Sequence, residues 1–158
     1  MRVGVVGLGF MGATHARAWQ SVAWARLSAV VSSDAAKLAG ELSNISGNLD
    51  RGGERLDFQG AHRYGSFAEL IADDEVDAVD LCTPSYLHAD QAVEALEAGK
   101  HVLVEKPMAT TPEDCLRMMA AAEASGKVLM VGHVLRFWPD YTTALKLVRS
   151  GHLGKLRS

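Results

Sequence analysis

Short apolar stretches alternate along this chain with longer segments in which apolar residues recur every three or four positions. The short stretches predict buried strands at residues 2–6, 26–32, 78–82, 101–104 and 128–131. The longer segments predict helices at residues 11–20, 34–42, 66–72, 88–98, 112–125 and 139–150. Strands that alternate with helices build βαβ units around a parallel sheet. We therefore predict an α/β fold, a doubly wound parallel sheet with helices on both faces.

Two segments depart from this alternation. Residues 43–60 are rich in glycine, asparagine and charged residues, and they predict a long surface connection. Residues 155–158 resemble the opening of a further strand. We therefore expect one domain over residues 1–154, followed at 155–158 by the start of a second domain that is absent from this chain.

Composition excludes several classes of protein. The chain has 158 residues, of which 48% are apolar and 22% charged, so it is long enough for a sizeable core and unlike a disordered chain. A net charge of −3 provides no basic field for binding nucleic acid. Two cysteines are too few for a disulfide scaffold, and the six histidines form no i,i+4 pair, so we expect no metal site.

The first residues allow two interpretations. A charged start, an apolar run and Ala16-Arg17-Ala18 have the form of a signal peptide. The regularly spaced glycines favour a strand that enters a glycine-rich turn. No stretch reaches the roughly 18 apolar residues that a membrane span needs. We therefore expect a cytoplasmic protein that does not bind a membrane.

The glycine-rich turn has the pattern G-x-G-x-x-G at Gly7, Gly9 and Gly12, between a predicted strand and a predicted helix. In this context the first glycine permits the tight turn, the second lets the backbone approach a pyrophosphate, and the third permits close packing of helix on strand. The start of the helix then offers free N–H groups to the phosphates. The pattern predicts a Rossmann-type dinucleotide site.

The end of the second strand bears on the choice of dinucleotide. NAD sites usually place an acidic residue about twenty positions beyond the glycine loop, where it binds the ribose 2′-hydroxyl. Here Ser32 and Ser33 occupy that place, and their hydroxyls donate to a 2′-phosphate without repelling it. Lys37 adds positive charge one helical turn later. These residues favour NADP over NAD. The alternative is that Asp34 binds the ribose, in place of capping the next helix, and this would favour NAD.

Two further motifs follow buried strands, at Thr83-Pro84 and at Glu105-Lys106-Pro107. Ligands of open α/β sheets bind at the carboxyl ends of the strands, so these residues are expected at the same edge as the glycine loop. Lys106 is placed there to orient a substrate hydroxyl or to stabilise an alkoxide as hydride leaves. The alternative is a solvated Lys106 beside a Glu105 salt bridge.

In this order, the segments VGVVGLGFMGATH, LCTPSYLH, HVLVEKPMA and MVGHVLRFWPDY resemble the N-terminal domain of the glucose–fructose oxidoreductase and inositol dehydrogenase family (Gfo/Idh/MocA). The resemblance covers essentially the whole chain. It implies a Rossmann domain that binds NAD(P), and hydride transfer between nicotinamide and a secondary hydroxyl of a sugar or polyol.

The resemblance also assigns roles to individual residues. Lys106 matches the catalytic lysine, and the Lys106–Pro107 peptide is often cis in the family. The other matched positions contact the cofactor: Phe10 and Met11 at the pyrophosphate, Ser32 at the ribose, and Thr83, Pro84, His88, Glu105 and Arg136 beside the nicotinamide half. The Ser32-Ser33 pair occurs in members that use NADP.

Family members carry a second domain, which supplies substrate contacts and a proton-transferring Asp/His pair. Without it we expect no turnover by these 158 residues, because proximity and water exclusion are both lost. The family usually assembles into oligomers through that second domain. Two alternatives remain: a stand-alone module that binds dinucleotide to sense redox state or dock a partner, and a structural subunit with a vestigial site. An exposed apolar patch near residue 158 favours the enzyme, whereas a polar surface favours the module.

A few residues have competing interpretations. His15 is expected to be packed or solvated on the first helix, and Cys82 to be a small core residue. His133 follows a strand and faces either the cleft or solvent. Phe137, Trp138 and Tyr141 either cover the cleft or pack against the absent domain.

Overall fold

A six-stranded parallel sheet with the order β3-β2-β1-β4-β5-β6 forms the centre of the computed structural model, which describes residues 1–42, 55–155 and 157. The strands are β1 (Arg2–Val6), β2 (Arg26–Val31), β3 (His62–Tyr64), β4 (Ala78–Leu81), β5 (His101–Val104) and β6 (Leu129–Val131). The strand order reverses between β1 and β4. Such a reversal opens a crevice at the carboxyl ends of the strands, as in dinucleotide-binding folds. The predicted Rossmann-type sheet is confirmed.

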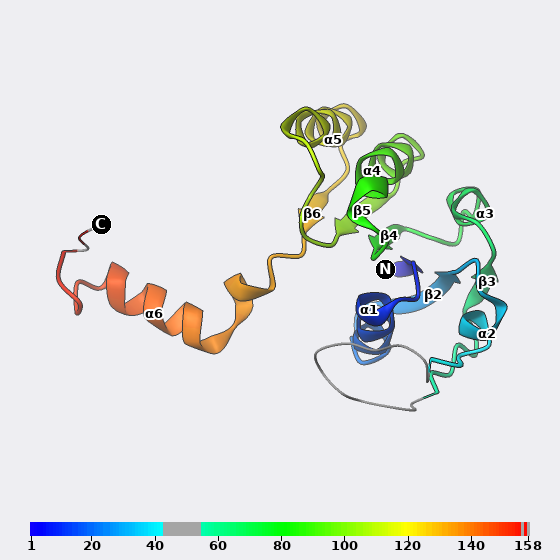
Figure 1. Cartoon of the computed structure of the whole chain (residues 1–158), viewed down its shortest axis with the longest axis horizontal. Coiled ribbons are helices and arrows are strands. Elements are labelled where there is room, and N and C mark those ends of the chain that lie inside the picture. Colours follow the sequence, from blue (N-terminus) through cyan, green and yellow to red (C-terminus); the bar gives the residue numbers. More distant parts are fainter. Residues whose placement is uncertain (43–54, 156, 158) are drawn as a thin grey trace.

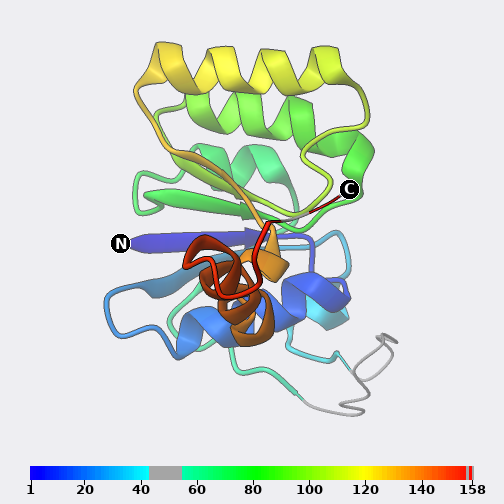
Figure 2. The same cartoon turned by 90° about the vertical axis from the view of Figure 1, so that its left-hand side faces the viewer.

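Helices cover both faces of this sheet (Figures 1 and 2). On one face lie α3 (Phe67–Ile71), α4 (His88–Glu97) and α5 (Pro112–Ser125). On the other lie α1 (Phe10–Gln20) and α2 (Ala35–Leu38). Two short 3-10 helices, η1 (Ser85–Leu87) and η2 (Val134–Phe137), follow β4 and β6. The last helix, α6 (Pro139–Arg149), contacts η2 and projects beyond the β6 side of the sheet (Figure 1).

Two apolar clusters form the core, one on each face of the sheet. The first joins the sheet to α3, α4 and α5 through residues such as Leu70, Val79, Leu96, Val104 and Met118. The second lies under α1 and contains Leu8, Ala16, Val30, Leu56 and Phe58.

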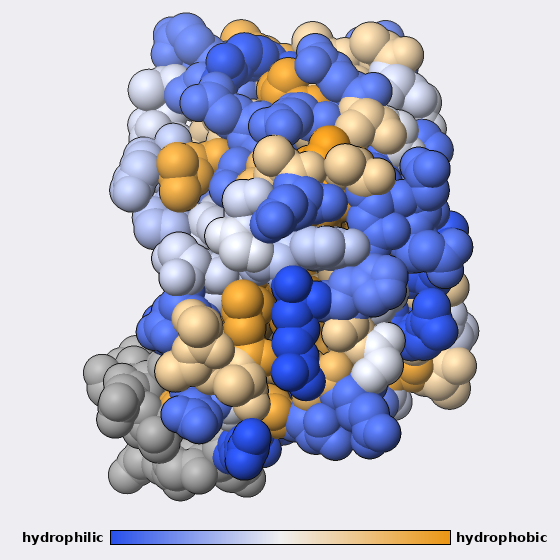
Figure 3. Space-filling model, turned by 90° about the vertical axis from the view of Figure 1, so that its right-hand side faces the viewer, coloured by the Kyte–Doolittle hydropathy of each residue, from blue (hydrophilic) through white to orange (hydrophobic). Residues whose placement is uncertain are grey.

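Hydrophilic side chains cover most of the side of the molecule opposite α6 (Figure 3). No helix among the described residues is long and apolar enough to cross a membrane, and the cytoplasmic location stays a prediction.

Three helix caps follow from the local sequence. Ser66 and Glu69 form a reciprocal capping box at the start of α3, and Thr111 caps α5 by accepting a hydrogen bond from the Asp114 amide. Gly126 ends α5 with a φ of 65°, a left-handed conformation that glycine adopts without steric cost. The predicted helix at 34–42 is shorter in the structure, where α2 ends at Leu38.

The prediction of a surface connection over residues 43–60 is wrong for its last part. Leu56 and Phe58 are buried beneath α1, and Arg55 pairs with Glu41 in an isolated antiparallel bridge. Residues 43–54 lie outside the described residues. Strand β3 was not predicted, because His62 and Arg63 are exposed and the three-residue strand has no apolar run.

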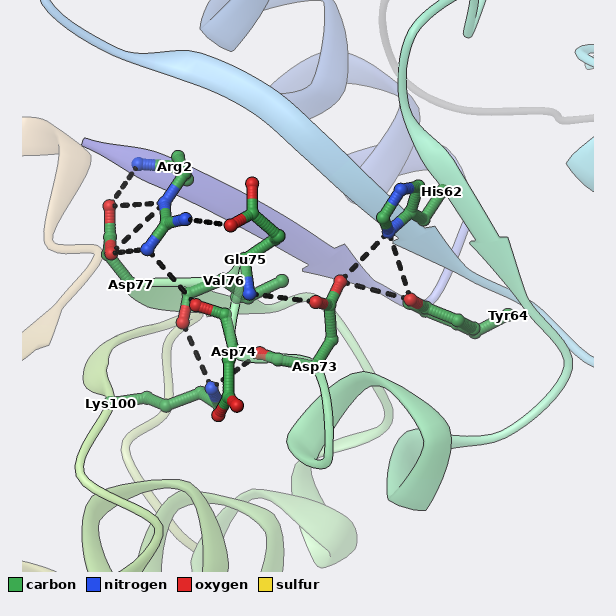
Figure 4. A network of polar contacts seen from close by, with 9 residues as sticks. All are labelled: Arg2, His62, Tyr64, Asp73, Asp74, Glu75, Val76, Asp77 and Lys100. Atoms are coloured by element: carbon green, nitrogen blue, oxygen red, sulfur yellow. Dashed lines mark hydrogen bonds and ion pairs between the residues drawn. The ribbon is translucent and has the colours of Figure 1, made fainter.

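A polar network closes the opposite, amino edge of the sheet (Figure 4). Arg2 binds the Asp77 carboxylate through its backbone N–H at 2.7 Å and its guanidinium at 2.7 Å. Lys100 is buried, and its ammonium donates to the carbonyl oxygens of Asp73 and Val76 at 2.8 and 2.9 Å. These contacts tie the loop before β4 to the starts of β1 and β5, well away from the glycine loop.

The Arg2–Asp77 pair predicts a specific acid dependence of stability. Hydrogen bonds from the Arg2 guanidinium and backbone lower the pKa of Asp77 to about 2, below its ordinary value. The pair therefore stabilises the fold fully above about pH 4, and this contribution is lost as the pH falls through about 2. Because the side chains are about one-third exposed, we expect Asp77→Asn to cost at most about 1 kcal/mol near neutral pH. Urea unfolding of both proteins at several pH values measures the difference, which should shrink toward low pH; a difference that stays constant contradicts the assignment.

Candidate functional site

The carboxyl ends of the parallel strands place the predicted motifs at one edge of the sheet. Backbone hydrogen bonds fix the strand exits next to one another: Gly7 N–H to Val31 O at 3.0 Å, Cys82 N–H to Val6 O at 2.9 Å, Glu105 N–H to Leu81 O at 3.0 Å and Gly132 N–H to Val104 O at 2.8 Å. The glycine loop, the Thr83 loop and the Lys106 loop therefore line one edge, as the sequence predicts.

The glycine loop has the geometry of a phosphate cradle. Gly7 has a φ of 89°, and a Cβ at Gly12 would overlap the Gly7 carbonyl oxygen, so each position is restricted to glycine by the fold itself. A Cβ at Gly9, in contrast, would meet no atom within 4 Å. Gly9 is therefore free of internal packing and leaves open the side from which a ligand would approach.

Helix α1 begins directly after this loop. Gly9 is its N-cap, no side chain caps it, and its first turn holds no acidic residue. Side chains cap α2, α3 and α5, whereas α4 and α6, like α1, have no side-chain cap. The first amides of α1, from Phe10 and Met11 onward, and the positive end of its dipole thus remain available to an anion. The loop and helix together fit the pyrophosphate of a dinucleotide.

At the end of β2, the side chain of Asp34 is occupied. Its carboxylate accepts hydrogen bonds from the amides of Ala36 and Lys37 at 2.9 and 3.4 Å and so caps α2. Ser32 Oγ accepts from the Asp34 amide at 3.1 Å, and Ser33 is exposed. The structure thus assigns Asp34 the helix-cap role, and the two hydroxyls remain at the end of the strand.

The buried His88 side chain contacts both the Thr83 loop and the Lys106 loop. Its Nε2 lies 2.8 Å from the Thr83 carbonyl oxygen, and its Nδ1 lies 2.9 Å from that of Pro107. The side chain is 1% exposed, which leaves no surface for direct contact with a cofactor. The cofactor-contacting role that the resemblance implies for His88 is therefore replaced by a role in holding the Thr83 and Lys106 loops together.

A hollow of about 440 Å³ opens beside the Lys106 loop. It is lined by Lys106, Pro107, His133, Val134, Leu135 and Arg136. The hollow thus brings Arg136 and His133, which follow β6, together with Lys106, which follows β5. The Lys106–Pro107 peptide is cis, as the resemblance implies.

A buried polar cluster lies between α1 and the strand ends. His15 Nδ1 lies 3.0 Å from an Asp80 carboxylate oxygen, and His15 Nε2 lies 3.2 Å from Glu105 Oε1. Trp19 Nε1 donates to Asp80 at 2.6 Å, and the Cys82 sulfur lies 3.4 Å from His15 Nδ1. His15, expected only to be packed or solvated, instead contacts the residue that precedes Lys106.

The pKa values of His15 and Cys82 are both raised in this cluster, although burial acts in opposite directions on the two groups. Burial lowers the pKa of His15, but hydrogen bonds and charges from Asp80 and Glu105 outweigh it, so the net pKa is raised. Burial, followed by the charges of Asp80 and Glu105, raises the pKa of the Cys82 thiol far above its usual range. Cys82 is therefore a neutral thiol that donates toward Asp80 at 3.6 Å, and it packs against the apolar cluster under α1, as expected for a small core residue.

Sequence spacing alone did not reveal this cluster, because 65 residues separate His15 from Asp80. The nitrogen, oxygen and sulfur atoms of His15, Asp80 and Cys82 lie within 4.8 Å of one another. Hydrogen bonds within the cluster already account for these atoms, and we interpret it as a hydrogen-bonded group. The signal in the sequence was Asp80 itself, a charged residue within the buried strand AVDL, which requires a polar partner.

Comparisons with known proteins agree with this geometry. Residues 1–133 match the family model described as "Oxidoreductase family, NAD-binding Rossmann fold" (GFO_IDH_MocA). The chain belongs to the Gfo/Idh/MocA oxidoreductase family. It contains the NAD-binding Rossmann domain of that family, whose members include dehydrogenases that act on polyols.

Curated relatives in the Gfo/Idh/MocA family extend well beyond this chain. Inositol 2-dehydrogenase 2 of Saccharopolyspora erythraea is 36% identical over 157 residues, which are 98% of this chain and 42% of that protein. Inositol 2-dehydrogenase of Corynebacterium glutamicum is 37% identical over 158 residues, 99% of this chain and 43% of that protein. The chain thus spans less than half the length of these relatives.

Solved structures of dehydrogenases and reductases share the fold. Scyllo-inositol dehydrogenase from Lactobacillus casei, with bound NAD(H) and scyllo-inositol, has a TM-score of 0.79 and 26% identity over 98% of this chain and 42% of its own. A mutant 3-ketoreductase from Actinomadura kijaniata, in complex with TDP-benzene and NADP, has a TM-score of 0.79 and 27% identity over 99% of this chain and 46% of its own. Structures similar to this Gfo/Idh/MocA chain thus contain either dinucleotide.

Proposed function

We propose that the glycine loop, the start of α1 and the Ser32-Ser33 pair bind NADP in preference to NAD, for hydride transfer at a secondary hydroxyl of a sugar or polyol. The observation that carries this proposal is the cradle at the glycine loop: an uncapped helix start, no neighbour at Gly9 and a loop that only glycine permits at Gly12. The bound nicotinamide would accept or give the hydride.

Lys106 is the catalytic residue that we propose for this reaction. Its ammonium belongs to a solvent-exposed residue that lines the hollow shared with His133 and Arg136. A cation at this place orients a substrate hydroxyl and stabilises negative charge on its oxygen as hydride leaves. Unlike Lys106, Glu105 is buried, and its carboxylate contacts His15 and the Lys106 amide.

The surface around α6 favours an enzyme with a further domain over a stand-alone module. Large apolar side chains are exposed in η2, in α6 and at the residue between them, among them Leu135, Phe137, Trp138, Tyr141 and Leu145. Monomeric proteins rarely leave such apolar groups together in water. We propose that further protein covers this surface, and that the 158 residues alone bind dinucleotide without turning over a polyol. Polyol-dependent reduction of NADP or NAD by the chain alone would contradict this proposal.

Calorimetric titration of the chain with NADPH and, in parallel, with NADH tests the proposed cofactor. We expect both to bind and NADPH to bind more tightly. Equal or tighter binding of NADH would overturn the preference and return Asp34 to the ribose role. Failure of both to bind would overturn the proposal that this domain alone forms a competent dinucleotide site.

Replacing Ser32 with aspartate should reverse the preference. A carboxylate at this position repels a 2′-phosphate and accepts a hydrogen bond from a 2′-hydroxyl, so we expect NADPH affinity to fall by about tenfold or more while NADH affinity holds or rises. The matched control is Ser32→Ala, which removes the hydroxyl without adding charge and should weaken NADPH binding far less. If Ser32→Asp leaves the ratio of the two affinities unchanged, Ser32 does not read the ribose.

A further inference from the structure

An unbroken line of polar contacts connects the interior of the sheet to the backbone of the proposed catalytic lysine. It starts at Asp80 in β4, whose side chain is fully buried, and passes through His15 at 3.0 Å. His15 Nε2 lies 3.2 Å from Glu105 Oε1, and Glu105 Oε2 accepts a hydrogen bond from the Lys106 amide at 3.0 Å. The line therefore joins α1, which follows the glycine loop, to the loop that carries Lys106.

The arrangement defines which protonation state of His15 fits. Each ring nitrogen lies beside a carboxylate, and an ionised carboxylate accepts hydrogen bonds but donates none. A neutral imidazole carries one N–H and satisfies only one side, whereas the imidazolium donates to Asp80 and to Glu105 together. In the described part of the chain, the titratable groups that contact the imidazole are Asp80 from β4, Cys82 just after β4 and Glu105 just after β5.

We propose that His15 is a positioning residue, whose imidazolium ties Glu105 to helix α1 and thereby sets the place of the Lys106 backbone relative to the glycine loop. This inference rests on the proposed function, because it concerns how the two halves of the dinucleotide site are held in register. His15 itself is mostly buried and acts through Glu105, not on a ligand.

The sign of the pH effect follows from the charges. The carboxylates raise the pKa of His15 despite its burial, so the imidazolium persists above the pH at which an exposed histidine loses its proton. The line from Asp80 through His15 to Glu105 is complete below the raised pKa and is lost as the pH rises through it. Neutral His15 carries one N–H and cannot donate to Asp80 and Glu105 together, so the line is broken at one of its two hydrogen bonds.

The first test follows the Lys106 amide by nuclear magnetic resonance in the 158-residue chain, from about pH 5 to about pH 9, without any cofactor. We expect this amide to shift with the titration of His15, at a midpoint above that of an exposed histidine. His15→Gln should abolish the transition while the chain remains folded. The control is His152→Gln, since His152 is exposed and bonds only to Ser150 among the contacts described; it should leave the Lys106 transition in place. A Lys106 amide that titrates in the same way in His15→Gln overturns the proposal.

The second test measures NADPH affinity across the same range. In the native chain we expect affinity to fall by about fivefold as His15 loses its proton, and in His15→Gln we expect a flat profile over the same range. Binding with the same pH profile in both proteins shows that the link does not position the site and overturns the proposal. If NADPH fails to bind the native chain while the Lys106 amide follows His15, the proposed function fails but the link between His15 and Lys106 stands.

Discussion

Replacing Gly12 with alanine is expected to abolish dinucleotide binding and to destabilise the fold by several kcal/mol. A Cβ at this position would overlap the backbone carbonyl oxygen of Gly7, and neither backbone can move without separating α1 from β1. The buried contacts of α1 with the sheet, including those of Ala16, would be lost in part. Chemical denaturation measures the loss of stability, and calorimetry with NADPH measures the loss of binding.

Gly9→Ala is the matched variant that separates binding from folding. Its Cβ meets no atom of the protein within 4 Å, and Gly9 has a φ of −81°, which alanine adopts without strain. The chain should therefore keep nearly its full stability. If the pyrophosphate approaches the backbone here, the added methyl group blocks it, and NADPH affinity should fall by about a hundredfold. Undiminished binding by a well-folded Gly9→Ala protein would exclude this loop as the phosphate site.

Gly9 and Gly12 belong to the part of the site that could be predicted from local sequence. The sequence could place the three glycines, the serines that follow β2 and the motifs after β4 and β5 at one edge, because parallel strands bring their carboxyl ends together there. The doubly wound parallel sheet follows from the alternation of strands and helices, whereas the strand order comes from the structure. These predictions needed only local pattern and one rule of topology.

What the sequence concealed depends on contacts between distant segments. Strand β3 has two exposed residues out of three and lacks an apolar run, since it lies at the edge of the sheet. Leu56 and Phe58 stand alone among polar residues, and only the position of α1 above them shows that they are buried. The partnership of His15 with Asp80 and Glu105 requires three elements at once. In each case contacts between distant segments determine the structure, and local propensity does not predict such contacts.

His88 belongs to the same class of hidden contacts, and its removal should have the second large effect. The imidazole lies between the carbonyl oxygens of Thr83 and Pro107, in a place that is 1% exposed. In His88→Leu the carbonyl oxygen that accepts from the imidazole N–H loses its buried donor, and the contacts of the ring with both loops are removed, so we expect a cost of about 2–4 kcal/mol in the free energy of unfolding. The exposed Glu94 on the same helix provides the control, because Glu94→Gln should change stability by less than about 0.5 kcal/mol.

The same variant tests whether His88 supports the site. Since His88 joins the Thr83 loop to the Lys106 loop, its loss frees the two loops that flank the proposed nicotinamide position, while the glycine loop is untouched. NADPH affinity should therefore fall by about tenfold under conditions in which His88→Leu remains folded, and an adenine nucleotide that engages only the glycine loop should bind as before. Equal losses for both ligands would mean that His88 acts on the whole domain, and unchanged affinity for both would mean that the two loops are held by other contacts.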